Sequence, residues 1–92
     1  MSNTYQIYLI SDSTGETLDR IFLALKAQFK NIEYEVKPYS FTRTENQILK
    51  ILDDANKKEN SVILYTIVDN NLAKYLANVS DKKKIPCFGV LD

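Results

Sequence analysis

The chain has 92 residues, which is enough for one small domain and too few for two. Hydrophobic residues make up 45% of it and charged residues 26%, proportions typical of globular proteins, so the composition argues against wholesale disorder. Twelve basic and twelve acidic residues cancel, and they interleave along the chain. The broad positive field that nucleic-acid binding needs is therefore absent, and no nucleic-acid partner is expected.

The residue types also limit the chemistry. The chain has one cysteine, Cys87, and no histidine, which excludes an internal disulfide, zinc sites of the Cys/His kind and catalysis by imidazole. The apolar runs are short, and the first residues lack a signal-peptide pattern, so we expect a cytoplasmic protein that does not span a membrane. Carboxylates, hydroxyls, lysine or arginine must carry any catalysis.

The first part of the chain predicts a strand, a helix and a second strand. Residues 5–11 (YQIYLIS) are β-branched and aromatic and end at small polar residues, as a strand leading into a loop does. From Glu16 to Phe29 the apolar residues recur at helical spacing. Residues 32–39 alternate apolar and charged side chains and contain Pro38, which favours a strand near a sheet edge.

The second part continues the alternation. Thr44 and Gln47 have the spacing of a capping box, which predicts a helix over about residues 45–58. Residues 61–68 (SVILYTIV) are nearly all apolar and predict a strand covered on both faces. Asp69 can cap a third helix, and residues 86–91 predict a last strand.

This alternation predicts an α/β fold, because right-handed crossovers place the helices on both faces of a parallel sheet. We expect a single three-layer domain over residues 1–92, with about four strands in the order 2-1-3-4. The strand order then reverses between the first and third strands, where ligands bind in such folds. Because the chain stops directly after a strand, we expect an N-terminal fragment of a longer protein.

Three polar loops follow the first three predicted strands, over residues 11–17, 40–45 and 66–70. In a parallel sheet they meet at one edge, which is therefore the candidate site. Gly15 lets a backbone approach a ligand closely, and the following helix offers free N–H groups and the positive end of its dipole to a phosphate. Asp12 is the proposed catalytic residue, and the proposed phosphate- or substrate-binding residues are Ser11, Ser13, Thr14, Gly15, Thr17, Arg43, Thr44 and Asp69.

The sequence also allows a purely structural role for several of these residues. Ser13 and Glu16 have the spacing of an ordinary capping box, Asp69 can simply cap a helix, and Arg43 can be a solvated side chain beside a capping Thr44. The unpaired carboxylate of Asp12 repels phosphate, so its presence at such a site makes sense if Mg²⁺ bridges it to the ligand or if it accepts the threonine proton as a base.

Four segments in order resemble a known family: LISDSTGET (9–17), YSFTRTENQ (39–47), LYTIVD (64–69) and IPCFGVLD (85–92). They resemble the N-terminal part of the pyruvate, phosphate dikinase regulatory proteins, a family that includes the phosphoenolpyruvate synthase regulatory proteins. The resemblance implies a bifunctional serine/threonine kinase and phosphorylase, with the target enzyme as its partner. One activity would phosphorylate a threonine of the target with ADP, and the other would remove that phosphate with inorganic phosphate, releasing pyrophosphate.

The resemblance also implies that ADP and phosphate are substrates of the longer protein and that Mg²⁺ is a candidate metal. We also expect the protein to form a homo-oligomer. The family's phosphate-binding loop lies downstream, and this chain, with two glycines, has no G-x-x-x-x-G-K-[ST] segment. We therefore expect this part alone to be an inactive domain that contributes to binding the target. Asn70 stands where the family often has a proline.

The alternative is a flavodoxin-like FMN-binding electron-transfer domain. Residues 13–17 (STGET) also look like the loop that holds the phosphate of flavin mononucleotide. The loop after the third predicted strand, however, offers no aromatic residue to flank a flavin.

Overall fold

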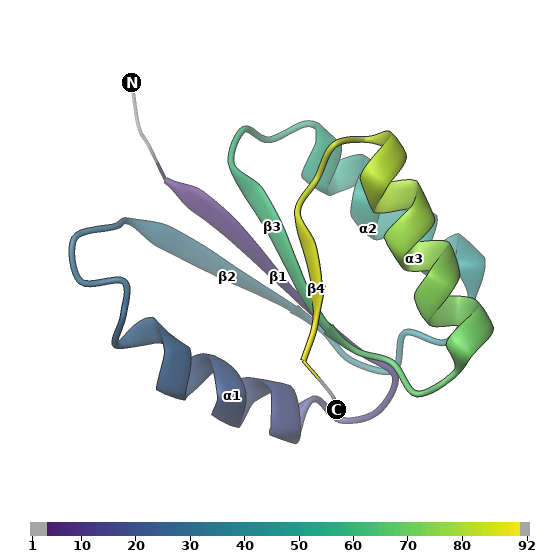
Figure 1. Cartoon of the computed structure of the whole chain (residues 1–92), viewed down its shortest axis with the longest axis horizontal. Helices are drawn as coiled ribbons and strands as arrows, with labels where there is room; N and C mark the ends of the chain where they lie inside the picture. Colours follow the sequence, from purple (N-terminus) through teal and green to yellow (C-terminus); the bar gives the residue numbers. More distant parts are fainter. Residues whose placement is uncertain (1–3, 91–92) are drawn as a thin grey trace.

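The computed structural model describes residues 4–90, in which strands and helices alternate (Figure 1). The strands are β1 (Tyr5–Ser11), β2 (Tyr34–Tyr39), β3 (Ser61–Thr66) and β4 (Cys87–Gly89), and the helices are α1 (Glu16–Lys26), α2 (Glu45–Asn56) and α3 (Asn70–Lys82). The strands form one parallel sheet in the order β2-β1-β3-β4. The predicted fold class, strand number and strand order are confirmed.

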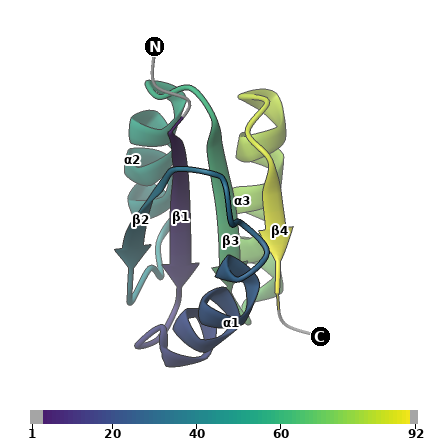
Figure 2. The same ribbon diagram turned by 90° about the vertical axis from the view of Figure 1, so that its left-hand side faces the viewer.

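The sheet lies between two layers of helices. Figure 2 shows α1 on one side of the sheet and α2 and α3 on the other. The arrangement follows from right-handed crossovers, because the chain moves one way from β1 to β2 and the opposite way from β2 to β3 and β4. Within residues 4–90, no helix has the length and apolar character needed to cross a bilayer.

Several elements are shorter than the sequence predicts. Helix α1 ends at Lys26, although Phe29 still packs on the sheet. Strand β2 begins at Tyr34, two residues after the predicted start at Ile32. Helix α2 ends at Asn56 and β3 at Thr66. The predicted last strand extends to Leu91, which lies outside the described residues.

Strand β4 pairs with β3 over three residues, the last pair being Tyr65 and Gly89. A β-carbon at Gly89 would lie 3.0 Å from the ring of Tyr65, closer than side chains normally approach. Glycine at this position therefore allows the Tyr65 ring to lie across β4.

The larger core lies between the sheet and the pair α2 and α3. Its side chains are almost completely inaccessible to water, and they include Tyr8, Ile10, Ile48, Leu52, Ile63 and Leu76. The α1 face has a smaller core, formed by Ile7, Leu9, Leu18 and Phe22. One helix thus covers one face of the sheet, while two helices cover the other.

A polar network joins β1, β2 and α2 at the border of the larger core. The hydroxyl of the buried Tyr8 donates a hydrogen bond to Asp54 Oδ2 at 2.7 Å, and Lys37 Nζ lies 3.4 Å from the same oxygen. The ring of Tyr39 stacks on that of Tyr8 with 6.1 Å between centroids. Burial, reinforced by the bond to Asp54, raises the pKa of Tyr8, and the Tyr8 hydroxyl in turn lowers the pKa of Asp54.

Replacing Asp54 with asparagine should make folding less sensitive to acid. Tyr8 and Lys37 lower the pKa of Asp54 in the folded chain, so its carboxylate stabilises the fold above the unfolded-state pKa of about 4. That contribution is lost as pH falls through the folded-state pKa. Urea unfolding between about pH 7 and pH 3 should therefore show a smaller loss of stability for Asp54→Asn than for the wild type.

Asp81→Asn is the matched control, because Asp81 is an exposed α3 carboxylate with no ion pair among residues 4–90. An Asp54→Asn profile parallel to that of the wild type would show that the network does not contribute to acid sensitivity.

Candidate functional site

The loops that follow β1 and β2 are joined by main-chain hydrogen bonds at the carboxyl edge of the sheet. The N–H groups of Phe41 and Thr42 donate to the carbonyls of Ser13 and Ser11, at 2.9 and 2.8 Å. The side chain of Thr42 is buried beneath this junction. The two loops therefore have fixed positions relative to each other.

Asp12 joins all three loops. Its Oδ2 accepts a hydrogen bond from the Val68 N–H at 2.9 Å, and its own N–H donates to the Thr66 carbonyl at 3.3 Å. The Nε of Arg43 donates to the Asp12 carbonyl at 2.9 Å. The three polar loops that the sequence placed at one edge do meet there, around Asp12.

Arg43 is anchored at one side and open at the other. Besides the Nε bond to Asp12, its guanidinium lies 5.2 Å from the centroid of the Phe41 ring. Its terminal nitrogens, Nη1 and Nη2, make no hydrogen bond to any residue from 4 to 90. A guanidinium held in this way can present both terminal nitrogens to a phosphate or carboxylate.

Gly15 starts α1 with a backbone that side chains disfavour. It is the N-cap with a φ of +86°, and no side chain caps the helix. The capping box considered for Ser13 and Glu16 is therefore wrong. The first N–H groups of α1 are left without a side-chain acceptor, and they favour an anion, although Glu16 and Asp19 in the first turn already interact with the helix dipole.

The hydroxyl groups of the first loop differ in their availability. Ser11 is buried, and its Oγ accepts a hydrogen bond from the Ser13 N–H at 3.1 Å. Ser13 and Thr14 are exposed in the loop, and Thr17 is exposed in the first turn of α1. The Ser13 hydroxyl lies 3.3 Å from that of Ser11 and can share a hydrogen bond with it. Ser11 therefore supports the loop, whereas Thr14 and Thr17 are exposed beside the helix start without a side-chain partner among residues 4–90.

Thr44 and Asp69 act as helix caps. The Thr44 hydroxyl accepts from the Gln47 N–H at 3.1 Å while the Gln47 amide oxygen accepts from the Thr44 N–H at 3.0 Å, so the predicted capping box is confirmed. Asp69 Oδ1 accepts from the Leu72 N–H at 3.1 Å. Both residues lie at the carboxyl edge, and these bonds commit their side chains to the starts of α2 and α3.

Sequence reasoning missed two residues that shape this edge. Ser40 donates a hydrogen bond from its Oγ to the Thr14 carbonyl at 2.9 Å, and Phe41 has a φ of +54°, which is uncommon for a residue other than glycine. The polar character of residues 40–45 indicated a loop here. No residue type in that loop signals a left-handed backbone at an aromatic residue, because the bonds to the neighbouring loop impose it.

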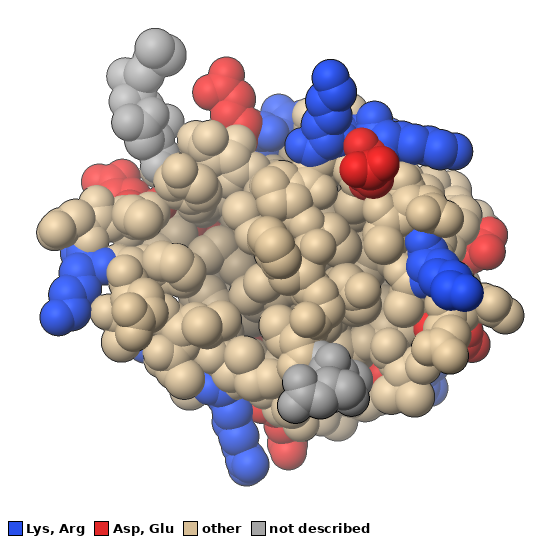
Figure 3. Space-filling model, in the orientation of Figure 1, with Lys and Arg blue, Asp and Glu red and all other residues tan. Residues whose placement is uncertain are grey.

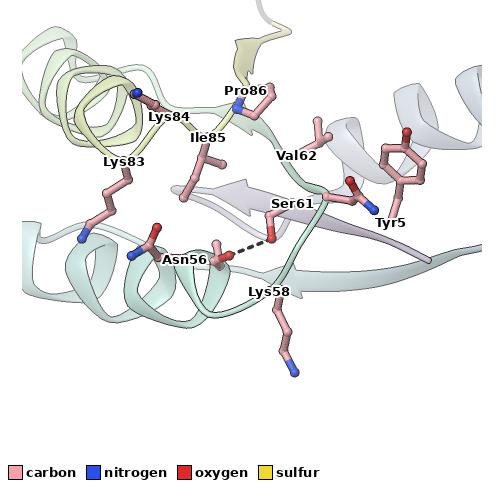
Figure 4. Close-up of a pocket in the computed structure, with 11 residues that line it drawn as sticks. Tyr5, Asn56, Lys58, Ser61, Val62, Lys83, Lys84, Ile85 and Pro86 are labelled. Atoms are coloured by element: carbon pink, nitrogen blue, oxygen red, sulfur yellow. Dashed lines mark hydrogen bonds between the residues drawn. The ribbon is translucent and has the colours of Figure 1, made fainter. Parts of the chain in front are cut away.

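A hollow at the opposite edge of the sheet is a weaker candidate. It measures about 330 Å³, and its lining includes Lys58, Lys83 and Lys84. Figure 4 shows the side chains of Lys58 and Lys83 ending well apart rather than converging, and Lys83 Nζ lies 3.8 Å from Asp53 Oδ1. The lysines follow the carboxyl ends of α2 and α3, where the helix dipoles favour cations and disfavour an anionic ligand.

The carboxyl edge thus brings together an anchored guanidinium, an oriented carboxylate and an uncapped helix start. It lies where the strand order reverses, the position at which doubly wound α/β domains bind ligands. Among residues 4–90, no group of three His, Cys, Asp or Glu side chains could hold a metal ion. The fold and the edge define a doubly wound α/β domain suited to binding a phosphate-bearing ligand.

Comparison with known proteins gives the family. Residues 7–92 match the model of the kinase/pyrophosphorylase family, and the chain belongs to that family. A relative from Pelagibacter ubique (strain HTCC1062), described as a pyruvate, phosphate dikinase regulatory protein, is 76% identical over 91 residues, which are 99% of this chain and 33% of the relative. The resemblance inferred from the four sequence segments is confirmed, and the match favours it over the flavodoxin-like alternative.

More distant relatives carry the same description. One from Geotalea uraniireducens (strain Rf4) is 41% identical over 86 residues, covering 94% of this chain and 32% of the relative. Another from Alkaliphilus oremlandii (strain OhILAs) is 40% identical over 85 residues, which cover 92% of this chain and 30% of the relative. The chain therefore spans about a third of the length of the curated relatives it matches.

Proposed function

We propose that this chain is the N-terminal domain of a bifunctional serine/threonine kinase and phosphorylase that regulates pyruvate, phosphate dikinase or phosphoenolpyruvate synthase. In the kinase direction, the terminal phosphoryl group of ADP moves to a threonine oxygen of the target, the threonine loses its proton, and AMP leaves. In the phosphorylase direction, the phosphoryl group moves from phosphothreonine to inorganic phosphate, which gives pyrophosphate and free threonine. The family match and the names of the relatives support this proposal.

In the structure, the main support for this proposal is that three loops converge around Asp12 and Arg43. Every reactant in the two directions carries phosphate or receives it. The open Nη1 and Nη2 of Arg43, the first N–H groups of α1 and the exposed hydroxyls of Ser13, Thr14 and Thr17 supply donors for such a group.

The hydrogen bonds of Asp12 support a role for it in accepting the threonine proton. The Val68 N–H holds its Oδ2, while Oδ1 makes no hydrogen bond to residues 4–90 and remains available to accept a proton. Asp12 is also the carboxylate at the centre of this edge that could ligate Mg²⁺, whose charge would offset that of the phosphate. Asp69, in contrast, uses Oδ1 to cap α3.

The 92-residue chain alone should transfer no phosphate, because it lacks the glycine- and lysine-containing loop that binds nucleotide phosphates. The test uses ADP labelled in its terminal phosphate and both candidate target enzymes. Labelled threonine should appear with the full-length protein and not with this chain. The full-length protein can be assembled by replacing the matching third of the Pelagibacter ubique relative with this chain.

Two results would contradict the proposal in different ways. Transfer by the 92-residue chain alone would show that the catalytic apparatus is complete within it. Failure of the folded full-length protein to label either target, together with failure to form pyrophosphate from phosphorylated target and phosphate, would overturn the proposed activity itself.

A further inference from the structure

The sheet face beneath α1 is only partly covered. Beyond the carboxyl-terminal end of α1 lies a groove of about 310 Å³, lined entirely by apolar and aromatic residues, among them Tyr5, Leu25, Ile32, Val62 and Phe88. We call it the apolar groove. Phe88 is 56% exposed and Ile32 is 44% exposed, values that large apolar side chains rarely keep when a layer of helices covers them.

The apolar groove continues into the unpaired edge of β4. Phe88 lies in β4 and also lines the groove, and β4 has no neighbour on its outer side among residues 4–90. Figure 3, in the orientation of Figure 1, shows charged side chains around the rim of this view and an uncharged centre. Exposed edge strands are usually protected by charges or by a covering segment, and β4 (CFG) contains no charged residue.

The sheet topology limits which kind of segment can cover the apolar groove. The crossovers that carry the chain from β2 to β3 and from β3 to β4 place α2 and α3 on the face opposite α1. By the same handedness, a helix leading from β4 to a new strand beside it would join α2 and α3. Coverage of the apolar groove therefore requires a different helix, one that crosses back toward α1.

We propose that the apolar groove is the docking site of an amphipathic helix of the same protein, supplied by the two thirds of the relatives' length outside the matching region. The relatives provide ample chain for such a helix, since the match covers 33% of the Pelagibacter ubique protein. A concave groove is suited to the convex apolar face of a helix about 10 Å in diameter.

Thiol labelling tests this proposal without relying on activity. In a Cys87→Ala background, Phe88→Cys places a thiol in the apolar groove, and Leu23→Cys places one on α1 outside it. The two positions are matched, because Phe88 and Leu23 are each 56% exposed. Maleimide should react with Phe88→Cys at least about tenfold more slowly in the full-length protein than in the 92-residue chain, and equally fast with Leu23→Cys in both.

Equal rates for Phe88→Cys in the two proteins would overturn the proposal. Protection already present in the 92-residue chain, and lost on dilution, would also overturn it by identifying a second copy as the occupant. A second readout is the thermal midpoint of the full-length protein, which should fall with Phe88→Lys and not with Leu23→Lys. A Phe88→Lys midpoint equal to that of Leu23→Lys would contradict the docked helix independently of the labelling.

Discussion

Replacing Asp12 with asparagine in the full-length protein should slow phosphorylation and phosphorolysis together, by about thirtyfold to a thousandfold. The asparagine side-chain oxygen can still accept the hydrogen bond from the Val68 N–H, so the three loops should keep their arrangement. The substitution removes the negative charge and the ability to accept the threonine proton. Initial rates in both directions, together with an unchanged thermal midpoint, provide the measurement.

Glu45→Gln is the matched control, because it removes a carboxylate from the first turn of α2 at the same edge of the sheet. It should leave both rates close to those of the wild type. Near-normal rates for Asp12→Asn would reduce Asp12 to a residue that joins the loops. An equal loss in both variants would show that the total charge of the edge matters rather than the carboxylate of Asp12.

Arg43→Ala should lower both rates by a similar factor and should raise the concentration of inorganic phosphate needed for phosphorolysis. The reason is that the terminal nitrogens of Arg43 are open, while its Nε bond to Asp12 and its contact with Phe41 set the direction of the guanidinium. Arg43→Lys should restore only part of the rate, since an ammonium group cannot bond to the Asp12 carbonyl and also offer two parallel donors.

Arg20→Ala, which removes an exposed guanidinium from α1, is the control and should leave the phosphate dependence unchanged. If Arg43→Ala shows the wild-type dependence on phosphate, Arg43 is a solvated side chain that packs on Phe41. Measuring the saturation curve as well as the maximal rate separates loss of phosphate binding from a general disturbance of the loop.

Local patterns in the sequence predicted the fold well, because the signals that define each element lie within a few residues. The start of α2 is an example. Thr44 and Gln47 are one helical turn apart, so the capping box depends on nothing outside that turn. The parallel sheet follows in the same way from the regular alternation of strands and helices.

The geometry of the edge could not be predicted, because distant residues determine it. Ser13 and Glu16 have the same spacing as Thr44 and Gln47, yet α1 starts from a left-handed Gly15. The orientation of Asp12 depends on the N–H of Val68, which is 56 positions away in the sequence. The sequence could therefore indicate which loops meet, and the structure was needed to show which atoms bind one another.

The contact between Gly89 and Tyr65 has a consequence for how β4 is aligned during folding. Three residue pairs select one alignment of β4 only weakly, because a strand this short can form main-chain hydrogen bonds with β3 in several alignments. A slip by one residue would place Phe88 or Val90 opposite Tyr65 and turn its side chain toward the α2 and α3 face. Its β-carbon would then meet the Tyr65 ring, which lies only 3.0 Å from a β-carbon built at Gly89. A side chain opposite Tyr65 would have to displace the end of that ring, so this contact disfavours the slipped registers of the outermost strand.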